Sequence, residues 1–158
     1  MAESLSDQII CKIKDASDLY HRLILVVAPA GTGKTKVLRD VEKRISTCLI
    51  NVNLELSRLM LDLTKRQRAL QLPKLLMDIV NDVAGDVVLL DNIEILCAVS
   101  LEQDPLRLLQ GLSRNKTVVA AWNGTIDRNY VTYAEPVHPE YRRYTVSDFL
   151  VVSPQVIT

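Results

Sequence analysis

A continuous apolar run, a glycine-rich loop and a helical pattern follow one another directly, and this order constrains the fold more than any other feature. Leu23–Val27 contains no polar residue, as expected of a strand that is buried on both faces of a parallel sheet. After the loop, Lys34–Arg44 carries apolar residues at helical spacing. The stretch VVAPAGTGKT matches the phosphate-binding pattern G-x-x-x-x-G-K-[ST], with Ala28 in place of its first glycine.

The residue types of this loop suit a phosphate chain. Backbone N–H groups at a helix N-terminus attract negative charge, and Gly31 and Gly33 stand where the backbone must come close to the ligand. Lys34 would reach the β- and γ-phosphates, and the Thr35 hydroxyl would bind Mg²⁺. Ala28 adds one methyl group at the end of the strand, which the loop should tolerate. The alternative is a glycine-rich turn beside a surface lysine. The candidate nucleotide-binding residues are Pro29, Ala30, Gly31, Thr32, Gly33, Lys34, Thr35 and Lys36.

Further apolar runs alternate with helical patterns along the chain. This alternation predicts a mostly parallel sheet with helices on both faces, a three-layer αβα domain that fills residues 1–158. Pro73 is expected to end one helix before another begins. Tyr130–Tyr133 is expected to be a short edge strand or a hairpin arm. The five main strands are expected at 23–27, 48–52, 87–91, 117–121 and 149–152.

Composition excludes several classes of protein. The chain has 19 Lys and Arg against 19 Asp and Glu, so no overall field favours nucleic acid, and direct DNA contact stays an open question. Three widely spaced cysteines and two histidines do not form a disulfide framework or a metal cluster. The charged N-terminus is unlike a secretory signal, and no apolar run is long enough to cross a membrane. We therefore expect a cytoplasmic protein without membrane association.

A second motif, VVLLDNIE, ends in acidic residues. A buried strand that ends in Asp91 is the Walker B pattern, and this carboxylate would lie beside the loop and support Mg²⁺. Many nucleotide hydrolases have Glu at the next position as the base that polarises water, but here Asn92 cannot take a proton. Glu94 is the nearest substitute. It could equally be a solvated residue in a first helical turn.

Polar residues near the last strands complete the set of candidates. Asn123, shortly after the predicted strand 117–121, fits a sensor that hydrogen-bonds the γ-phosphate or the attacking water; an Asn-Gly turn is the alternative. Arg142 and Arg143 lie where ring-forming ATPases often have an arginine finger. A surface arginine pair is the alternative. The candidate catalytic residues are Lys34, Asp91, Glu94, Asn123, Arg142 and Arg143, and the candidate metal ligands are Thr35 and Asp91.

Several longer stretches carry a family resemblance. NVNLELSRLM, VVLLDNIEIL, VVAAWNGT and YAEPVHPEYRRY together resemble BrxF, the small P-loop protein of type 3 BREX systems, which protect bacteria against phage. The likeness runs from Ala28 to Tyr144. It implies a cytoplasmic P-loop NTPase that works beside other BREX proteins. It also implies nucleotide and Mg²⁺ roles for Lys34, Thr35 and Asp91.

The sequence thus predicts a P-loop ATPase that uses ATP and Mg²⁺, with an AAA-like core. Because little sequence follows Val152, no C-terminal helical lid is expected, so turnover should rise on assembly with itself or with partners. ATP is preferred over GTP because no guanine-reading N-K-x-D motif is visible. Two alternatives stay open. One is a nucleotide-dependent switch or adaptor with negligible hydrolysis, which Asn92 favours; the other is a small-molecule kinase.

Overall fold

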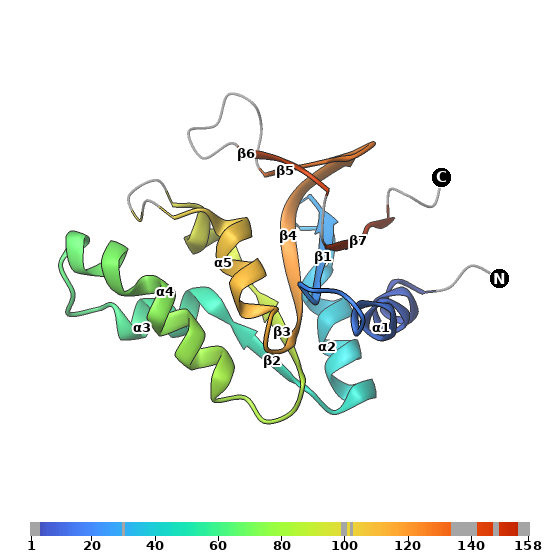
Figure 1. Ribbon diagram of the computed structural model, residues 1–158, viewed down its shortest axis with the longest axis horizontal. Helices are drawn as coiled ribbons and strands as arrows, with labels where there is room; N and C mark the ends of the chain where they lie inside the picture. The colour runs from blue at the N-terminus through green and yellow to red at the C-terminus, as the bar shows by residue number, and fades with distance from the viewer. Residues whose placement is uncertain are drawn as a thin grey trace.

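The computed structural model describes residues 4–29, 31–98, 101, 103–133, 142–146 and 149–154. In these residues, five α-helices, one 3₁₀ helix and seven strands are arranged as helix layers around a central sheet (Figure 1). The elements are α1 Leu5–Ala16, β1 Leu23–Ala28, α2 Lys34–Ile45, β2 Cys48–Asn51, α3 Val52–Leu59, α4 Lys65–Asn81, β3 Val87–Asp91, η1 Ile93–Cys97, α5 Pro105–Leu112, β4 Thr117–Asp127, β5 Tyr130–Tyr133, β6 Arg142–Thr145 and β7 Leu150–Val152.

The predicted parallel sheet is confirmed. Five strands pair in the order β2-β3-β4-β1-β7, and every neighbouring pair is parallel. β1 lies near the centre and is fully buried along its length, which explains its uninterrupted apolar sequence. Because the strands are parallel, their carboxyl ends meet at one edge of the sheet. The loop after β1 lies at this edge.

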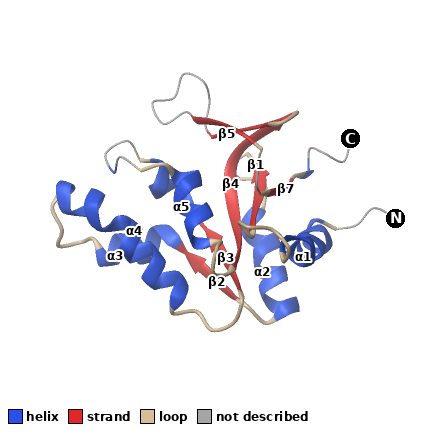
Figure 2. Ribbon diagram, viewed as in Figure 1, coloured by secondary structure: helices blue, strands red, loops and turns tan. Residues whose placement is uncertain are grey.

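Helices cover both faces of the sheet, as expected. α1 and α2 pack on one face, against alternate residues such as Ile24 and Val26. α3, α4, α5 and η1 pack on the other, against Leu25 and Val27. Figure 2 shows these two groups on opposite sides of the strands. Within the described residues, no helix is long and apolar enough to cross a membrane.

The sheet is larger than predicted, because β4 continues beyond its parallel part. From Gly124 onward β4 pairs antiparallel with β5, and β5 pairs with β6, so Tyr130–Tyr133 is the hairpin arm. Gly124 is required where the two strands approach, since a Cβ there would lie 1.7 Å from the Thr132 carbonyl oxygen. The Trp122 indole N–H also donates to that oxygen, at 3.0 Å. The strand β6 was not predicted.

The prediction of a helix break at Pro73 is wrong. α4 runs through Pro73, which is exposed on the helix. A proline cannot donate a hydrogen bond to the carbonyl four residues earlier, here Ala69. The Gln103 side-chain amide donates to the Ala69 oxygen instead, at 2.6 Å. A residue from a distant loop therefore compensates for the missing helical hydrogen bond.

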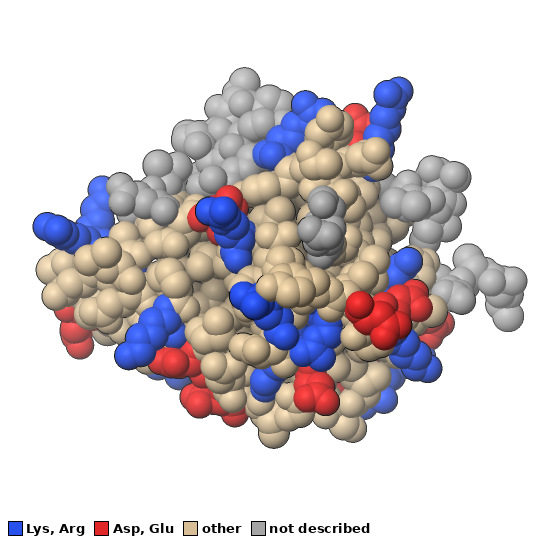
Figure 3. Space-filling view, viewed as in Figure 1, with Lys and Arg blue, Asp and Glu red and all other residues tan. Residues whose placement is uncertain are grey.

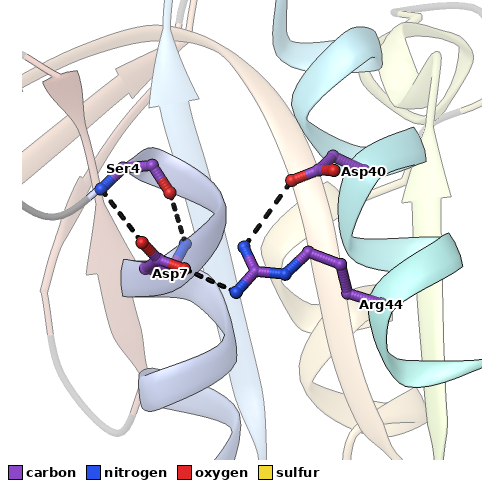
Figure 4. A network of polar contacts seen from close by, with 4 residues as sticks. All are labelled: Ser4, Asp7, Asp40 and Arg44. Atoms are coloured by element: carbon purple, nitrogen blue, oxygen red, sulfur yellow. Dashed lines mark hydrogen bonds and ion pairs between the residues drawn. The ribbon is translucent and has the colours of Figure 1, made fainter.

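A polar network joins α1 to α2 across their exposed sides (Figure 4). The Arg44 guanidinium of α2 lies 2.6 Å from an Asp7 carboxylate oxygen of α1 and 3.6 Å from Asp40 one helical turn away. Asp7 also closes a capping box with Ser4 at the start of α1. Elsewhere, charges of both signs are interspersed over the face seen in Figure 3, in keeping with the balanced composition.

Candidate functional site

The glycines of the loop adopt backbone conformations that other residues avoid. Gly31 has a φ of 80° and Gly33 a φ of 89°, both in the left-handed region. A Cβ added at either position would meet no atom within 4 Å. In this structure, backbone conformation rather than crowding therefore requires glycine. Gly33 is the N-cap of α2, so the loop leads directly to the N-terminus of that helix.

The backbone at Ala28 does not need the glycine that the phosphate-binding pattern has at this position. It is the last residue of β1, is 1% exposed and pairs with Asn123 of β4. It is not among the residues with positive φ, so glycine is not needed there. Next to it, the Pro29 carbonyl accepts a hydrogen bond from the Thr32 hydroxyl at 2.7 Å. Ala30 lies outside the described residues.

Lys34 is buried at the base of the loop, so the alternative of a surface lysine is wrong. Its side chain is 7% exposed, and Nζ donates to the carbonyl oxygens of Ala28 at 2.9 Å and Pro29 at 2.8 Å. Burial lowers the pKa of this ammonium group below its usual value, while the nearby carboxylates of Glu94 and Asp91 act to raise it. Lys34 therefore lies within the electrostatic reach of both acids that the second motif contributes.

The start of α2 after the loop and the end of β3 meet directly. The Thr35 hydroxyl donates to an Asp91 carboxylate oxygen at 2.5 Å, and the other oxygen of Asp91 accepts from the Asn92 backbone N–H at 2.9 Å. Asp91 is 6% exposed. A hydroxyl and a carboxylate are oxygen ligands of the kind that Mg²⁺ prefers. No group of three His, Cys, Asp or Glu suited to a metal occurs in the described part of the chain, so phosphate and water oxygens would have to supply the other ligands.

Glu94 and Asn123 contact each other across the sheet edge. Glu94 lies in η1 and is half-buried, and the Asn123 side-chain amide donates a hydrogen bond to its carboxylate. Glu94 does lie in a first helical turn, as the alternative expected, but it is half-buried and hydrogen-bonded rather than solvated. The alternative of an Asn-Gly turn is wrong, because Asn123 and Gly124 lie within β4. Asn123 is the last residue of β4 in register with β1, which places it opposite Ala28.

Sequence reasoning missed a contact that positions this acidic segment. Asn92 has a φ of 54°, and its carbonyl accepts from the Asn53 backbone N–H at 3.1 Å. This hydrogen bond links the first turn of α3 to the segment between Asp91 and Glu94. Asparagine enters the left-handed region more readily than most residues, which was the one available signal.

The remaining candidates are not brought to this cluster by any described contact. Lys36 is exposed on α2. The Arg143 guanidinium lies over the Tyr130 ring, 3.8 Å from its centre, in the β5–β6 hairpin. Arg142 belongs to β6, but its side chain lies outside the described residues. The hairpin is joined to the part of β4 that follows Asn123, and Figure 1 shows it projecting from that end of the strand.

Comparison with known proteins gives a distant likeness to solved structures. No family model and no curated protein matches the chain. A solved structure, that of C. elegans PCH-2, aligns with a TM-score of 0.47 and 17% sequence identity, over 78% of this chain and 38% of that one. This chain therefore spans well under half the length of PCH-2.

Proposed function

We propose that this chain is an ATP-binding, Mg²⁺-dependent P-loop ATPase of the AAA-like type. One observation carries the proposal: the Thr35 hydroxyl is hydrogen-bonded to Asp91, beside a buried Lys34. The glycine-rich loop and Asp91 at the end of β3 could have lain far apart in the fold. Their direct contact supports a single site for the triphosphate of a nucleotide.

Each residue of the cluster has a chemical task in this proposal. The N–H groups at the start of α2 would bind the phosphate oxygens, and Lys34 would exchange its two carbonyl partners for the β- and γ-phosphates. Thr35 and Asp91 would hold Mg²⁺, which would supply positive charge to neutralise the phosphates. Glu94 would accept a proton from the attacking water, and Asn123 would orient Glu94 or that water.

Calorimetry and phosphate release test this assignment. Lys34→Ala should abolish measurable binding of Mg-ATP and with it the release of phosphate. Lys43→Ala is the matched control, because Lys43 is exposed near the other end of the same helix. Equal phosphate release from wild type and Lys34→Ala would reject the proposal.

A nucleotide-dependent switch is the second candidate, favoured by Asn92 at the position where a catalytic glutamate often stands. Glu94→Gln separates the two functions. If the chain hydrolyses ATP, this variant should keep nucleotide affinity and lose most of the phosphate release. If the chain is a switch, wild type and variant should bind alike and show no turnover, alone or with partners.

The biological context that we propose rests on the resemblance to BrxF. The stretches NVNLELS, AWNG and HPEYRRY support a cytoplasmic component of a BREX phage-defence system, acting with other proteins of that system. Co-purification of the tagged chain with the products of neighbouring genes, with and without ATP, tests the partnership. A phage challenge of a deletion strain complemented by wild type or Lys34→Ala tests the role in defence. If the deletion strain without complementation stays fully protected against phage, the role in defence is rejected.

A further inference from the structure

An open edge of the sheet lies next to a groove that contains none of the loop residues. β2 ends the strand order and pairs only with β3 along the part of the chain that the structure describes. The Leu49 backbone N–H points to the open side, where the Glu42 carboxylate accepts it at 2.7 Å. Because backbone groups alternate along a strand, the Asn51 N–H faces the same side, while the Asn51 carbonyl, as that of the N-cap, accepts the first hydrogen bond of α3. An unpaired edge of this kind can accept a further strand.

The groove beside this edge has a volume of about 630 Å³. It is bounded by β2 and by the C-terminal end of α4, and Ile50, Ile79 and Val83 give it an apolar floor. Two carboxylates, Glu55 and Asp82, also line it, and no Lys or Arg is among its lining residues in the described chain. Arg58 lies 3.9 Å from Glu55, at the outer limit of an ion pair, and is mostly exposed. The groove therefore combines backbone partners, apolar surface and negative charge.

We propose that an extended, basic segment of a partner protein binds here by adding a strand to β2. Backbone hydrogen bonds to the edge would supply affinity, and alternate side chains of the segment would reach the apolar floor. Lysine or arginine side chains elsewhere in the same row would meet Glu55 and Asp82, since every second side chain of the segment points into the groove. The Leu49 N–H would exchange its present acceptor, the Glu42 carboxylate, for a carbonyl oxygen of the incoming strand.

The charge of the groove argues against a second copy of this chain as the occupant. Two copies paired through β2 about a twofold axis would present the same surface to each other. Glu55 and Asp82 of one copy would then approach the like-charged groups of the other, which opposes association. A basic segment faces no such repulsion.

Fluorescence anisotropy with short synthetic peptides tests the proposal at low ionic strength. In the probe, valine and lysine take turns at every second residue, so that both kinds of side chain share one face, and serine occupies the positions between; one control replaces lysine by glutamate, and another carries N-methyl groups on alternate backbone amides. The lysine probe should bind, and each control should bind at least about tenfold more weakly, since one loses the charge match and the other the backbone ladder. Asp82→Asn should weaken the probe about threefold, a factor typical of a partly exposed charge pair, whereas Asp78→Asn, one turn earlier on α4, should not.

Hydrogen exchange locates the contact. The probe should slow exchange at the amides of Leu49 and Asn51, and Lys34→Ala should bind it as well as wild type, so failure here is distinct from failure of the nucleotide site. Equal binding of the N-methylated peptide, equal effects of Asp82→Asn and Asp78→Asn, or unchanged exchange in β2 would overturn the proposal. Dimerisation through β2 in solution would overturn it too.

Discussion

Asn92 shows how a single backbone conformation can decide which residue is available as a base. Its φ of 54° is unfavourable for residues with a Cβ but tolerated by asparagine and glycine. A glutamate there would carry a strain of about 1 kcal/mol. The conformation turns the chain into η1, and the first acid after it is Glu94.

Substitutions at Asn92 test this explanation. Asn92→Ala should lower the free energy of unfolding by about 1 kcal/mol, because alanine lacks the local hydrogen bonds that help asparagine into the left-handed region. Asn92→Gly should lie within about 0.5 kcal/mol of wild type, since glycine adopts this φ without strain. Urea denaturation measures both. Equal losses for the two variants would contradict a role for backbone conformation.

Much of the candidate site could be predicted from single residues, because parallel strands align their carboxyl ends. Asp91 ends one predicted parallel strand and Asn123 lies just beyond another, so both were expected at the carboxyl edge of the sheet, beside the loop. The carbonyl partners of Lys34 could not be predicted, since they depend on how the loop folds back on itself. The position of Arg143 over Tyr130 depends on a hairpin register that no local pattern specifies.

At the scale of elements, α4 shows why a proline rule failed. The sequence around Pro73 predicts a break because the ring removes one donor, and this loss is real. The sequence could not indicate that Gln103, thirty residues away along the chain and brought close by the fold, donates to the freed Ala69 carbonyl. Tyr130–Tyr133 was expected as a hairpin arm, but its partner β6 escaped prediction for a related reason: this pairing joins β5 to a strand that begins after residue 141.

A double-mutant cycle on α4 tests this compensation. Gln103→Ala should cost about 1 kcal/mol of stability, the usual net value of one hydrogen bond. In a Pro73→Ala background the helix regains its own N–H donor to Ala69, so the same substitution should cost clearly less. Gln71→Ala, at an exposed position of α4, is the control. A cost of Gln103→Ala that is the same in both backgrounds would show that the two residues are independent.

The contact between Asp7 of α1 and Arg44 of α2 predicts how the stability of the fold depends on pH. The hydrogen bond from Arg44 is the main cause that lowers the pKa of Asp7 below its usual 3.8, so folding favours the ionised carboxylate. The resulting stability is complete above pH 3.8 and is lost as the pH falls through the lowered pKa of the folded state. Arg44→Gln should therefore lower the melting temperature slightly at pH 7. The difference from wild type should narrow progressively in acid.

Arg39→Gln supplies the control for this comparison. Arg39 is exposed on the same helix, so the variant changes net charge equally. Arg39→Gln should leave the melting temperature near that of wild type both at pH 7 and in acid. A deficit of Arg44→Gln that stays constant down to pH 2 would show that the contact with Asp7 is not its cause.

At the scale of the whole molecule, the candidate site contains its acids and its lysine but no described arginine. The charged groups that act on Lys34 are Glu94 and Asp91. Arg143 lies instead in a hairpin that extends from β4, stacked on Tyr130. Transition states of phosphoryl transfer gain much of their stabilisation from an arginine, which another subunit can supply. An isolated chain should accordingly be a slow ATPase.

Assembly should then raise activity in a way that mixing experiments can resolve. Phosphate release per chain should increase with protein concentration for wild type, and Arg142→Ala or Arg143→Ala should remove that increase if the respective residue acts on a neighbouring subunit. Under the proposed function, Lys34→Ala would be inactive in its own site but would keep both arginines. Mixing it with the inactive arginine variant should therefore restore turnover at interfaces where an intact loop meets an intact arginine.

Sedimentation with and without Mg-ATP should show assembly over the same concentration range. If mixtures stay inactive while wild type assembles, the arginine does not act between copies of this chain, and a different partner must complete the site.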